Sequence, residues 1–193
     1  MPAAPGFTYL PQPYAAQQSA TSNPWNVVSA STGPGDAEYQ LGQQCRAGSP
    51  DGEDYLRALG HYLKAAQAGN AEAMCMAGNI YLMGLGTPKD NSQAMYWLRA
   101  GAALDNPGSI NNLGYMYKYG DGVPQDYNQA ASYFRHAADL GLPDAENNIG
   151  LSCVAGLGIP QDYVQARYWF EKAKAGGCDK AVKNLEKLTA SGH

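Results

Sequence analysis

The sequence predicts an all-α protein in which about four helix-turn-helix repeats of 36 residues stack into an α/α solenoid, followed by a C-terminal capping helix. The first observation is a set of columns that return every 36 residues without a gap. The second is the residue type in each column, because glycine, aspartate and alanine suit different positions of a helix pair. The clearest columns are Gly78, Gly114 and Gly150; Asp90, Asp126 and Asp162; and Ala94, Ala130 and Ala166.

The glycine column lies within the first helix of each repeat, helix A, whose buried face is marked by residues four apart, such as Ala73 and Ala77. A glycine inside a helix costs about 1 kcal/mol relative to alanine. Its return in every copy therefore predicts that two helices come too close there for a Cβ atom. A Gly-x-Gly turn follows helix A and predicts a C-cap with positive φ. Because this turn follows a helix rather than a strand, it does not indicate a phosphate loop.

The aspartate column opens the second helix of each repeat, helix B. Each aspartate is followed three residues later by glutamine, as Asp126 is by Gln129, which is the pattern of a capping box. One aspartate per repeat at a helix start indicates N-capping rather than catalytic carboxylates or a calcium site. The alanine column belongs to the buried stripe of helix B, where small residues admit the neighbouring helix and aromatic residues fill the groove.

The predicted repeat array extends over residues 36–193. Its last stretch resembles a half repeat with a more charged face, and Glu186 stands where the glycine column would continue. This change predicts a cap. The expected boundaries are about 37–72, 73–108, 109–144 and 145–180 for the repeats, and 181–190 for the cap.

Residues 1–35 differ from the array in composition. They contain no charged side chain and are rich in Pro, Ala, Gln and Ser. Such a segment buries little surface and loses much entropy when ordered, so we expect a flexible tail. Pro2 and Pro5 form a P-x-x-P spacing that favours polyproline II, and aromatic residues such as Phe7 are present.

The composition disfavours several classes of function. A net charge of −4 argues against nucleic-acid binding, which needs a basic surface. No apolar stretch approaches the roughly 20 residues of a membrane span, and the N-terminal residues lack the features of a signal peptide, so we expect a cytoplasmic protein. The four cysteines form no C-x-x-C pair and the three histidines have no ligand spacing. We therefore expect no disulfide framework, no metal site and no cofactor.

Two copies of the repeat resemble a known family, the Sel-one-like repeat (SLR), an α/α repeat related to the tetratricopeptide repeat. The two copies read NNLGYMYKYGDGVPQDYNQAASYFRHAADLG and NNIGLSCVAGLGIPQDYVQARYWFEKAKAGG, and the resemblance covers residues 36–193. It implies a right-handed superhelix of antiparallel helix pairs with a concave surface lined by the A helices. It also implies a non-enzymatic scaffold or adaptor, common in bacteria, that binds another protein or a peptide segment.

The resemblance leaves two alternatives open. Some bacterial members are secreted effectors or immunity partners of toxins, and the uncharged tail would support export. A cysteine-rich branch is described as penicillin-binding or β-lactamase-like. This chain lacks the repeated cysteine pair of that branch, and no serine is followed three residues later by lysine. Because no nucleophile, base and orienting residue recur in a suitable arrangement, we expect no enzyme and no catalytic residue.

Columns that change between copies mark residues that are free to recognise a partner, and on helix A we expect them to line the concave surface. Tyr115 and Tyr119 are four residues apart with Lys118 beside them, which predicts aromatic anchors; the alternative is that these tyrosines pack against the next helix. Asn112 and Asn148 stand in a column that the family shares, so we assign them a structural role rather than a role in binding. We expect a monomer outside the complex. The candidate partner-binding residues are Asn79, Met83, Asn111, Tyr115, Lys118, Tyr119, Asn147 and Leu151.

Overall fold

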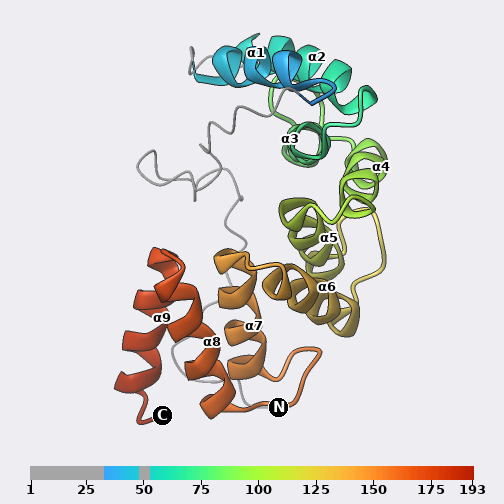
Figure 1. The fold of residues 1–193 in the computed structure, drawn as a ribbon. Helices are drawn as coiled ribbons and strands as arrows, with labels where there is room; N and C mark the ends of the chain where they lie inside the picture. The colour runs from blue at the N-terminus through green and yellow to red at the C-terminus, as the bar shows by residue number, and fades with distance from the viewer. Residues whose placement is uncertain (1–32, 48–52) are drawn as a thin grey trace. The chain divides into compact units, whose positions relative to one another are not determined.

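The computed structural model describes residues 33–47 and 53–193 (Figure 1). Within these ranges the chain forms nine helices and no strand, which confirms the predicted all-α repeat fold. The first 32 residues of the expected tail lie outside the described residues. The helices are α1 (Asp36–Ala47), α2 (Glu53–Gln67), α3 (Ala71–Met83), α4 (Asn91–Ala102), α5 (Pro107–Tyr119), α6 (Tyr127–Asp139), α7 (Pro143–Ala155), α8 (Tyr163–Ala175) and α9 (Asp179–Ala190).

The described residues divide into two compact units, the first of residues 33–47 and 53–101 and the second of residues 102–193. In the first unit α2 packs against both α1 and α3. Tyr62 of α2 is fully buried, and its ring centroid lies 5.8 Å from that of Tyr39 on α1. Asn70 caps α3 by accepting from the backbone N–H of Ala73, and its Nδ2 donates to Asp36 Oδ1 at 2.8 Å. One asparagine thus ties the start of α1 to the start of α3.

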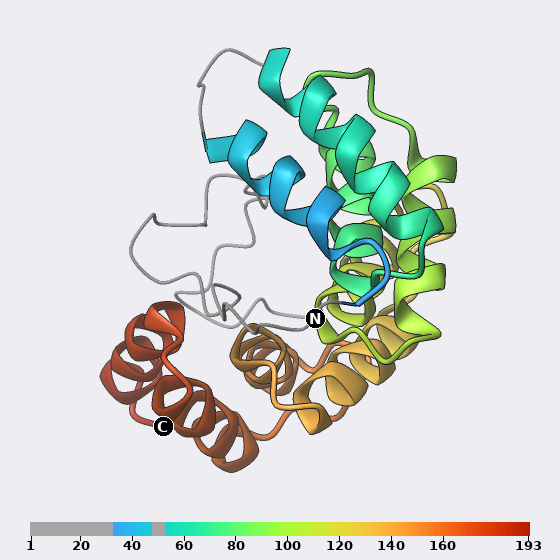
Figure 2. The same ribbon diagram turned by 45° about the horizontal axis from the view of Figure 1, so that its top comes forward.

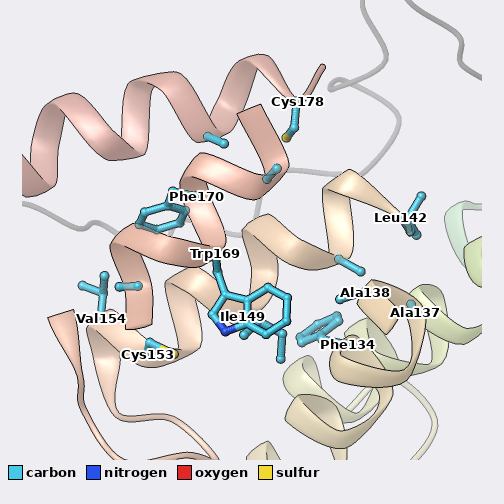
Figure 3. Close-up of a cluster of buried hydrophobic side chains, with 14 of the residues drawn as sticks. Phe134, Ala137, Ala138, Leu142, Ile149, Cys153, Val154, Trp169, Phe170 and Cys178 are labelled. Carbon is cyan, nitrogen blue, oxygen red and sulfur yellow. The ribbon is translucent and has the colours of Figure 1, made fainter. Parts of the chain in front are cut away.

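In the second unit each helix from α5 to α9 packs against the next one along the chain. Two views show α8 and α9 side by side (Figure 2). The core between α6, α7 and α8 holds Phe134, Ile149 and Phe170, each at most 1% exposed, with Trp169 at its edge (Figure 3). Stacking of neighbouring helix pairs therefore buries a continuous apolar core, as a repeat array requires.

The glycine column lies beneath a bulky side chain of helix B in every repeat. A Cβ atom on Gly150 would lie 2.5 Å from Cε1 of Phe170, and one on Gly78 would lie 2.6 Å from Cγ of Leu98. The predicted close approach is therefore present, and the nearest atoms belong to a side chain. The missing Cβ makes room for the ring or the leucine to pack closely against helix A.

The aspartate and alanine columns take the positions that the sequence assigns to them. Asp126 accepts from the backbone N–H groups of Asn128 and Gln129 at 2.9 and 3.0 Å. Asp90 accepts from the same two positions of its helix, and Asp162 accepts from the backbone N–H of Gln165. The Gly-x-Gly turns have positive φ, for example 75° at both Gly120 and Gly122. Ala94, Ala130 and Ala166 are buried.

The glutamine of each Pro-Gln-Asp turn has a role that the sequence analysis missed. Gln125 Nε2 donates to the backbone carbonyl of Lys118 at 2.8 Å and to Tyr127 Oη at 3.0 Å. Gln161 makes the equivalent bonds to the carbonyl of Val154 and to Tyr163 Oη. The amide fastens the turn to the last residues of helix A, where carbonyl groups lack a partner within the helix. The sequence feature that could have predicted this role is the string Gln-Asp-Tyr, which occurs in both turns.

The helix α9 packs on α8 and carries Glu186 in the glycine column, where this side chain is exposed. Leu185, which aligns with the fully buried Ile149, is only partly buried. The contact that joins helices A and B elsewhere depends on a missing Cβ. It therefore has no equivalent at this position of α9.

Candidate functional site

The eight candidate partner-binding residues fall in both units. Asn79 and Met83 lie on α3 of the first unit, and the other six lie on α5 and α7 of the second. Hydrogen bonds between α5 and α7 bring the second group together. We call this surface of the second unit the helix A surface; it consists of Asn111, Tyr115, Lys118 and Tyr119 of α5 and Asn147, Asn148 and Leu151 of α7.

Tyr115 combines a structural contact with a place on the helix A surface. Its hydroxyl donates to Asn148 Oδ1 at 3.0 Å, and its ring meets Phe134 edge to face at 5.3 Å. Burial raises the pKa of this phenol well above its usual range. Most contacts of Tyr115 are therefore packing contacts within the fold, as in the alternative interpretation. Truncating Tyr115 would disturb the array as well as any binding.

Tyr119 is the more accessible of the two tyrosines, with 44% of its surface exposed. Its ring lies parallel to that of Tyr115, with the centroids 6.1 Å apart. The ammonium of Lys118 lies 5.2 Å from the centroid of the Tyr119 ring, within the range of a cation–π contact. Burial lowers the pKa of Lys118 to about 8. These three residues thus form an aromatic surface with one cation at the end of α5.

Asn111 and Asn147 do not face outward as expected; they are 0% and 3% exposed. The reason is a ladder of amide hydrogen bonds between successive A helices. Asn148 Nδ2 donates to Asn111 Oδ1 at 2.9 Å, and Asn184 Nδ2 on α9 donates to Asn147 Oδ1 at 2.7 Å. The pair Asn-Asn stands at the same place in two successive repeats. These columns do not change between those copies, and that was the signal for a structural role.

The amide chain on α5 and α7 ends in a hydrogen-bond donor. The Tyr115 hydroxyl donates to Asn148, and Asn148 in turn donates to Asn111. Asn111 Nδ2 is buried and has no acceptor among the described residues. A buried donor without an acceptor costs about 1–3 kcal/mol. Because Asn111 is 0% exposed, this nitrogen lies inside the packed pair of helices and is not open to a partner.

The remaining candidates are less informative about binding. Asn79 Nδ2 lies 3.9 Å from Cys75 Sγ within α3. Met83 is half-buried at the end of the same helix. Leu151 of α7 packs against the core of the second unit and occupies the column of Tyr115, one repeat later.

The described residues offer no group of three or more His, Cys, Asp or Glu side chains suited to a metal ion. Burial raises the pKa of the Cys153 and Cys178 thiols, which disfavours the nucleophilic thiolate. Cys178 Sγ lies 3.7 Å from Asp144 Oδ1, an acidic neighbour that further disfavours a negative sulfur. No helix in the described part of the chain is long and apolar enough to cross a membrane.

Stacked helix pairs, glycine-to-ring contacts and capped turns define an α/α repeat protein. A family model described as the Sel1 repeat matches residues 35–70, 71–106, 107–142 and 143–178, so the chain belongs to the Sel1 repeat family. The resemblance read from the sequence is thereby confirmed. Proteins of this family are generally scaffolds for protein interaction and are generally non-catalytic.

Solved structures of bacterial proteins share this fold. A Sel1 repeat protein from Oxalobacter formigenes is 28% identical with a TM-score of 0.73, and the match covers 78% of this chain and 60% of that one. A protective antigen of uropathogenic Escherichia coli strains, which displays an SLR fold, is 31% identical with a TM-score of 0.71; the match covers 83% of this chain and 34% of the antigen.

A curated relative, an uncharacterized protein of Neisseria meningitidis serogroup B, is 36% identical over 89 residues. That match covers 46% of this chain and 19% of the relative. The chain thus spans less than two thirds of the length of each of these three proteins.

Proposed function

We propose that this chain is a non-enzymatic scaffold that binds a partner protein or peptide segment through the helix A surface of α5 and α7. The observation that carries the proposal is the Tyr119 ring, 44% exposed, stacked on Tyr115 and flanked by Lys118. Exposed aromatic side chains that are held in place by their neighbours are the usual anchors of protein interfaces. The general role of the family agrees with this proposal.

The surface provides both anchoring and orientation. Tyr119 lies against the Tyr115 ring, and the hydroxyl of Tyr115 is held by Asn148. Little conformational entropy is therefore lost when a partner covers the pair, which increases the affinity gained per contact. Lys118, beside the Tyr119 ring, adds a cation that favours carbonyl or carboxylate groups of the partner.

The test is an affinity capture from the lysate of the source organism with the wild-type chain and two variants. Tyr119→Ala removes the exposed ring and leaves the hydrogen bond between Tyr115 and Asn148 in place. Tyr168→Ala is the matched control, because Tyr168 on α8 is 54% exposed and lies outside the helix A surface. We expect one partner to be retained by wild type and Tyr168→Ala and to be depleted about tenfold or more by Tyr119→Ala, since an anchor contributes roughly 2 kcal/mol.

Equal capture by all three baits would contradict the proposal, because the helix A surface of α5 would then play no part.

We further propose that the chain is a cytoplasmic monomer outside its complex, with the repeat array at 36–193 preceded by the tail at 1–35. Light scattering after size exclusion tests the monomer. A mass of twice 20.5 kDa would contradict it.

A second candidate is a secreted effector or a toxin-immunity protein that uses the same surface. It is supported by the likeness to a protective antigen of uropathogenic Escherichia coli and by the uncharged segment 1–35. Fractionation of the source organism with an antibody against the array tests it. Detection outside the cell, lost when segment 1–35 is replaced by a Gly/Ser sequence of equal length, would support export. Detection in the cytoplasm alone would contradict the secreted effector.

A further inference from the structure

The helix α9 has a face that no described helix covers. Ala181 and Leu188, both 0% exposed, belong to the core of the second unit. The face formed by Val182, Leu185 and Thr189 is different, because these side chains are only partly buried or are exposed. Among the described helices, α8 is the only one with which α9 packs extensively (Figure 1). This second face is therefore open in the described part of the chain.

The repeat itself shows what such a face binds. The three residues of the open face occupy the columns that on α7 hold Glu146, Ile149 and Cys153. On α7 these side chains are only 4%, 0% and 3% exposed. The helix α8 packs on this side of α7, as α2 packs on α1 and α6 packs on α5. The columns of the open face are thus those through which an A helix receives another helix.

A groove lies along the open face. Its lining consists of Lys174 of α8 and Val182, Leu185, Glu186, Thr189 and Ala190 of α9, and its volume is about 520 Å³. We call it the α9 groove. Most of its exposed lining is apolar, and its two charged side chains have opposite signs. An apolar groove of this kind suits an amphipathic helix, whose apolar face enters the groove while its polar face stays in water.

Glu186 determines which helix fits. It stands in the glycine column, above which the B helices place a ring or a leucine. At the equivalent place of α7, a Cβ on Gly150 would lie 2.5 Å from Cε1 of Phe170. A helix with a ring at this position therefore cannot pack on α9 as α8 packs on α7. A cationic side chain fits better there, because it can pair with the exposed carboxylate.

The preceding repeat contains a pair of this kind. Glu146 of α7 is 4% exposed, and its Oε1 lies 3.0 Å from Nζ of Lys172 on α8. The same column holds Met74 and Ile110 in the two repeats before it. The interface between helices A and B thus accommodates a glutamate in place of an apolar residue when helix B supplies an ammonium group. Without that cation, burial of the carboxylate would be strongly unfavourable.

We propose that the α9 groove is the docking site of an amphipathic helix from another protein, which carries lysine or arginine opposite Glu186. The apolar residues of that helix pack on Val182 and Leu185, and an acidic residue faces Lys174. The groove shares no residue with the helix A surface. The chain therefore has two separate binding sites and can join two proteins, which goes beyond the proposed function of one surface.

Fluorescence anisotropy with a synthetic helix tests the proposal on the full chain. The probe is a labelled peptide of residues 162–177, which include α8, with the substitution Phe170→Lys. Because an isolated helix of this length is marginal in water, a hydrocarbon staple joins positions 164 and 168, which are 79% and 54% exposed on α8. A second peptide carries Phe170→Glu instead.

The charge is then reversed on the protein. Glu186→Lys changes the groove, and Glu171→Lys is the matched control, because Glu171 is an exposed carboxylate of α8 outside the groove. We expect the Phe170→Lys peptide to bind wild type and Glu171→Lys alike, and to bind Glu186→Lys about tenfold more weakly, as residues in direct contact are coupled. The Phe170→Glu peptide should show the opposite preference. Glu186 is exposed, so the fold should persist, and circular dichroism checks it.

Several outcomes would overturn the docking site. These are no binding of the Phe170→Lys peptide to wild type, equal binding to wild type and Glu186→Lys, or an equal loss in Glu171→Lys, which would indicate a general effect of charge. A wild-type dimer that Glu186→Lys dissociates, detected by light scattering, would assign the groove to a second copy of the chain and would also overturn it. None of these outcomes involves Tyr119, so the proposed function is decided by its own capture experiment.

Discussion

A Cβ atom on Gly114 would lie 2.6 Å from Cε1 of Phe134, a distance at which one of the two must move. The ring of Phe134 lies against Gly114 of α5 and makes an edge-to-face contact with the ring of Tyr115. The same relation returns with Tyr62, Leu98 and Phe170 in the other repeats. One missing methyl group thus sets how closely helices A and B approach, and through Tyr115 it also positions the helix A surface.

We predict that Gly114→Ala destabilises the protein. Overpacking a filled core costs about 1–3 kcal/mol, which exceeds the gain of up to about 1 kcal/mol from the better helix propensity of alanine. The matched control is Gly60→Ala in α2, where a Cβ meets nothing within 4 Å and only the propensity gain applies. Thermal unfolding should move in opposite directions for the two variants. Equal melting temperatures would contradict the packing role of Gly114. Gly114→Leu is expected to prevent folding of the second unit.

A second prediction concerns the amide ladder. Asn148→Ala removes the acceptor of the Tyr115 hydroxyl and the donor to Asn111 Oδ1, which should cost about 2–4 kcal/mol. Tyr115→Phe should cost about 1 kcal/mol, and the double variant should show a coupling of at least about 0.5 kcal/mol. Urea unfolding of the four proteins measures this cycle. Tyr117→Phe on the same helix is the control, and additive effects of Tyr115→Phe and Asn148→Ala would contradict the hydrogen bond.

The third prediction is a titration of Lys118. Burial lowers the pKa of this amine from 10.5 to about 8. Its 13Cε resonance, assigned by its absence in Lys118→Met, should therefore titrate with a midpoint near pH 8. Between pH 8 and pH 10.5 the unfolded chain binds more protons than the folded one, so stability due to this group rises with pH across that window.

The same linkage gives a stability test with Lys118→Met. Below pH 8 the wild type carries the full cost of the buried charge, so the methionine variant should melt higher at pH 7.5. The difference should shrink at pH 9.5, where the folded wild type is largely neutral. A constant difference at both pH values would show that Lys118 titrates with its ordinary pKa.

A fourth prediction concerns the turn glutamines. Gln161→Ala removes the hydrogen bonds to the carbonyl of Val154 and to Tyr163 Oη and should cost about 1 kcal/mol. Gln165→Ala is the matched control, because Gln165 bonds to Asp162 through its backbone N–H. Chemical unfolding compares the two variants. Losses of equal size would indicate that the turn is held by its backbone alone.

Much of the fold follows from the repeat of 36 residues. Each column has a residue type that suits one local role. Glycine permits the close approach of two helices, aspartate caps a helix N-terminus, and alanine is a small buried side chain, so the residue types identify the positions. The amide of Gln125 was harder to foresee, since glutamine is common on surfaces and its bond to the carbonyl of Lys118 forms only once the turn has closed.

The candidate site was predicted less well than the fold. Helical spacing placed Asn111 and Tyr115 on one face correctly, but it does not reveal which part of that face meets the next A helix. Asn111 was expected outward and is buried, because an asparagine fits an exposed surface and a buried ladder equally well until its partner is known. Tyr115 both packs within the fold and contributes to the helix A surface. Only Tyr119 keeps the exposure that an anchor needs.

Glu186 has a consequence for protein engineering. A B-type helix appended after α9 is not expected to pack as in the other repeats, because Glu186 brings a Cβ atom to the column in which a glycine makes room for a ring or a leucine. Glu186→Gly would remove that obstacle, and a following Gly-x-Gly turn with a Pro-Gln-Asp start would supply the remaining signals of a repeat. Replacing Glu186 is therefore the first change that an extension of the array requires, before the turn and the new helix are added.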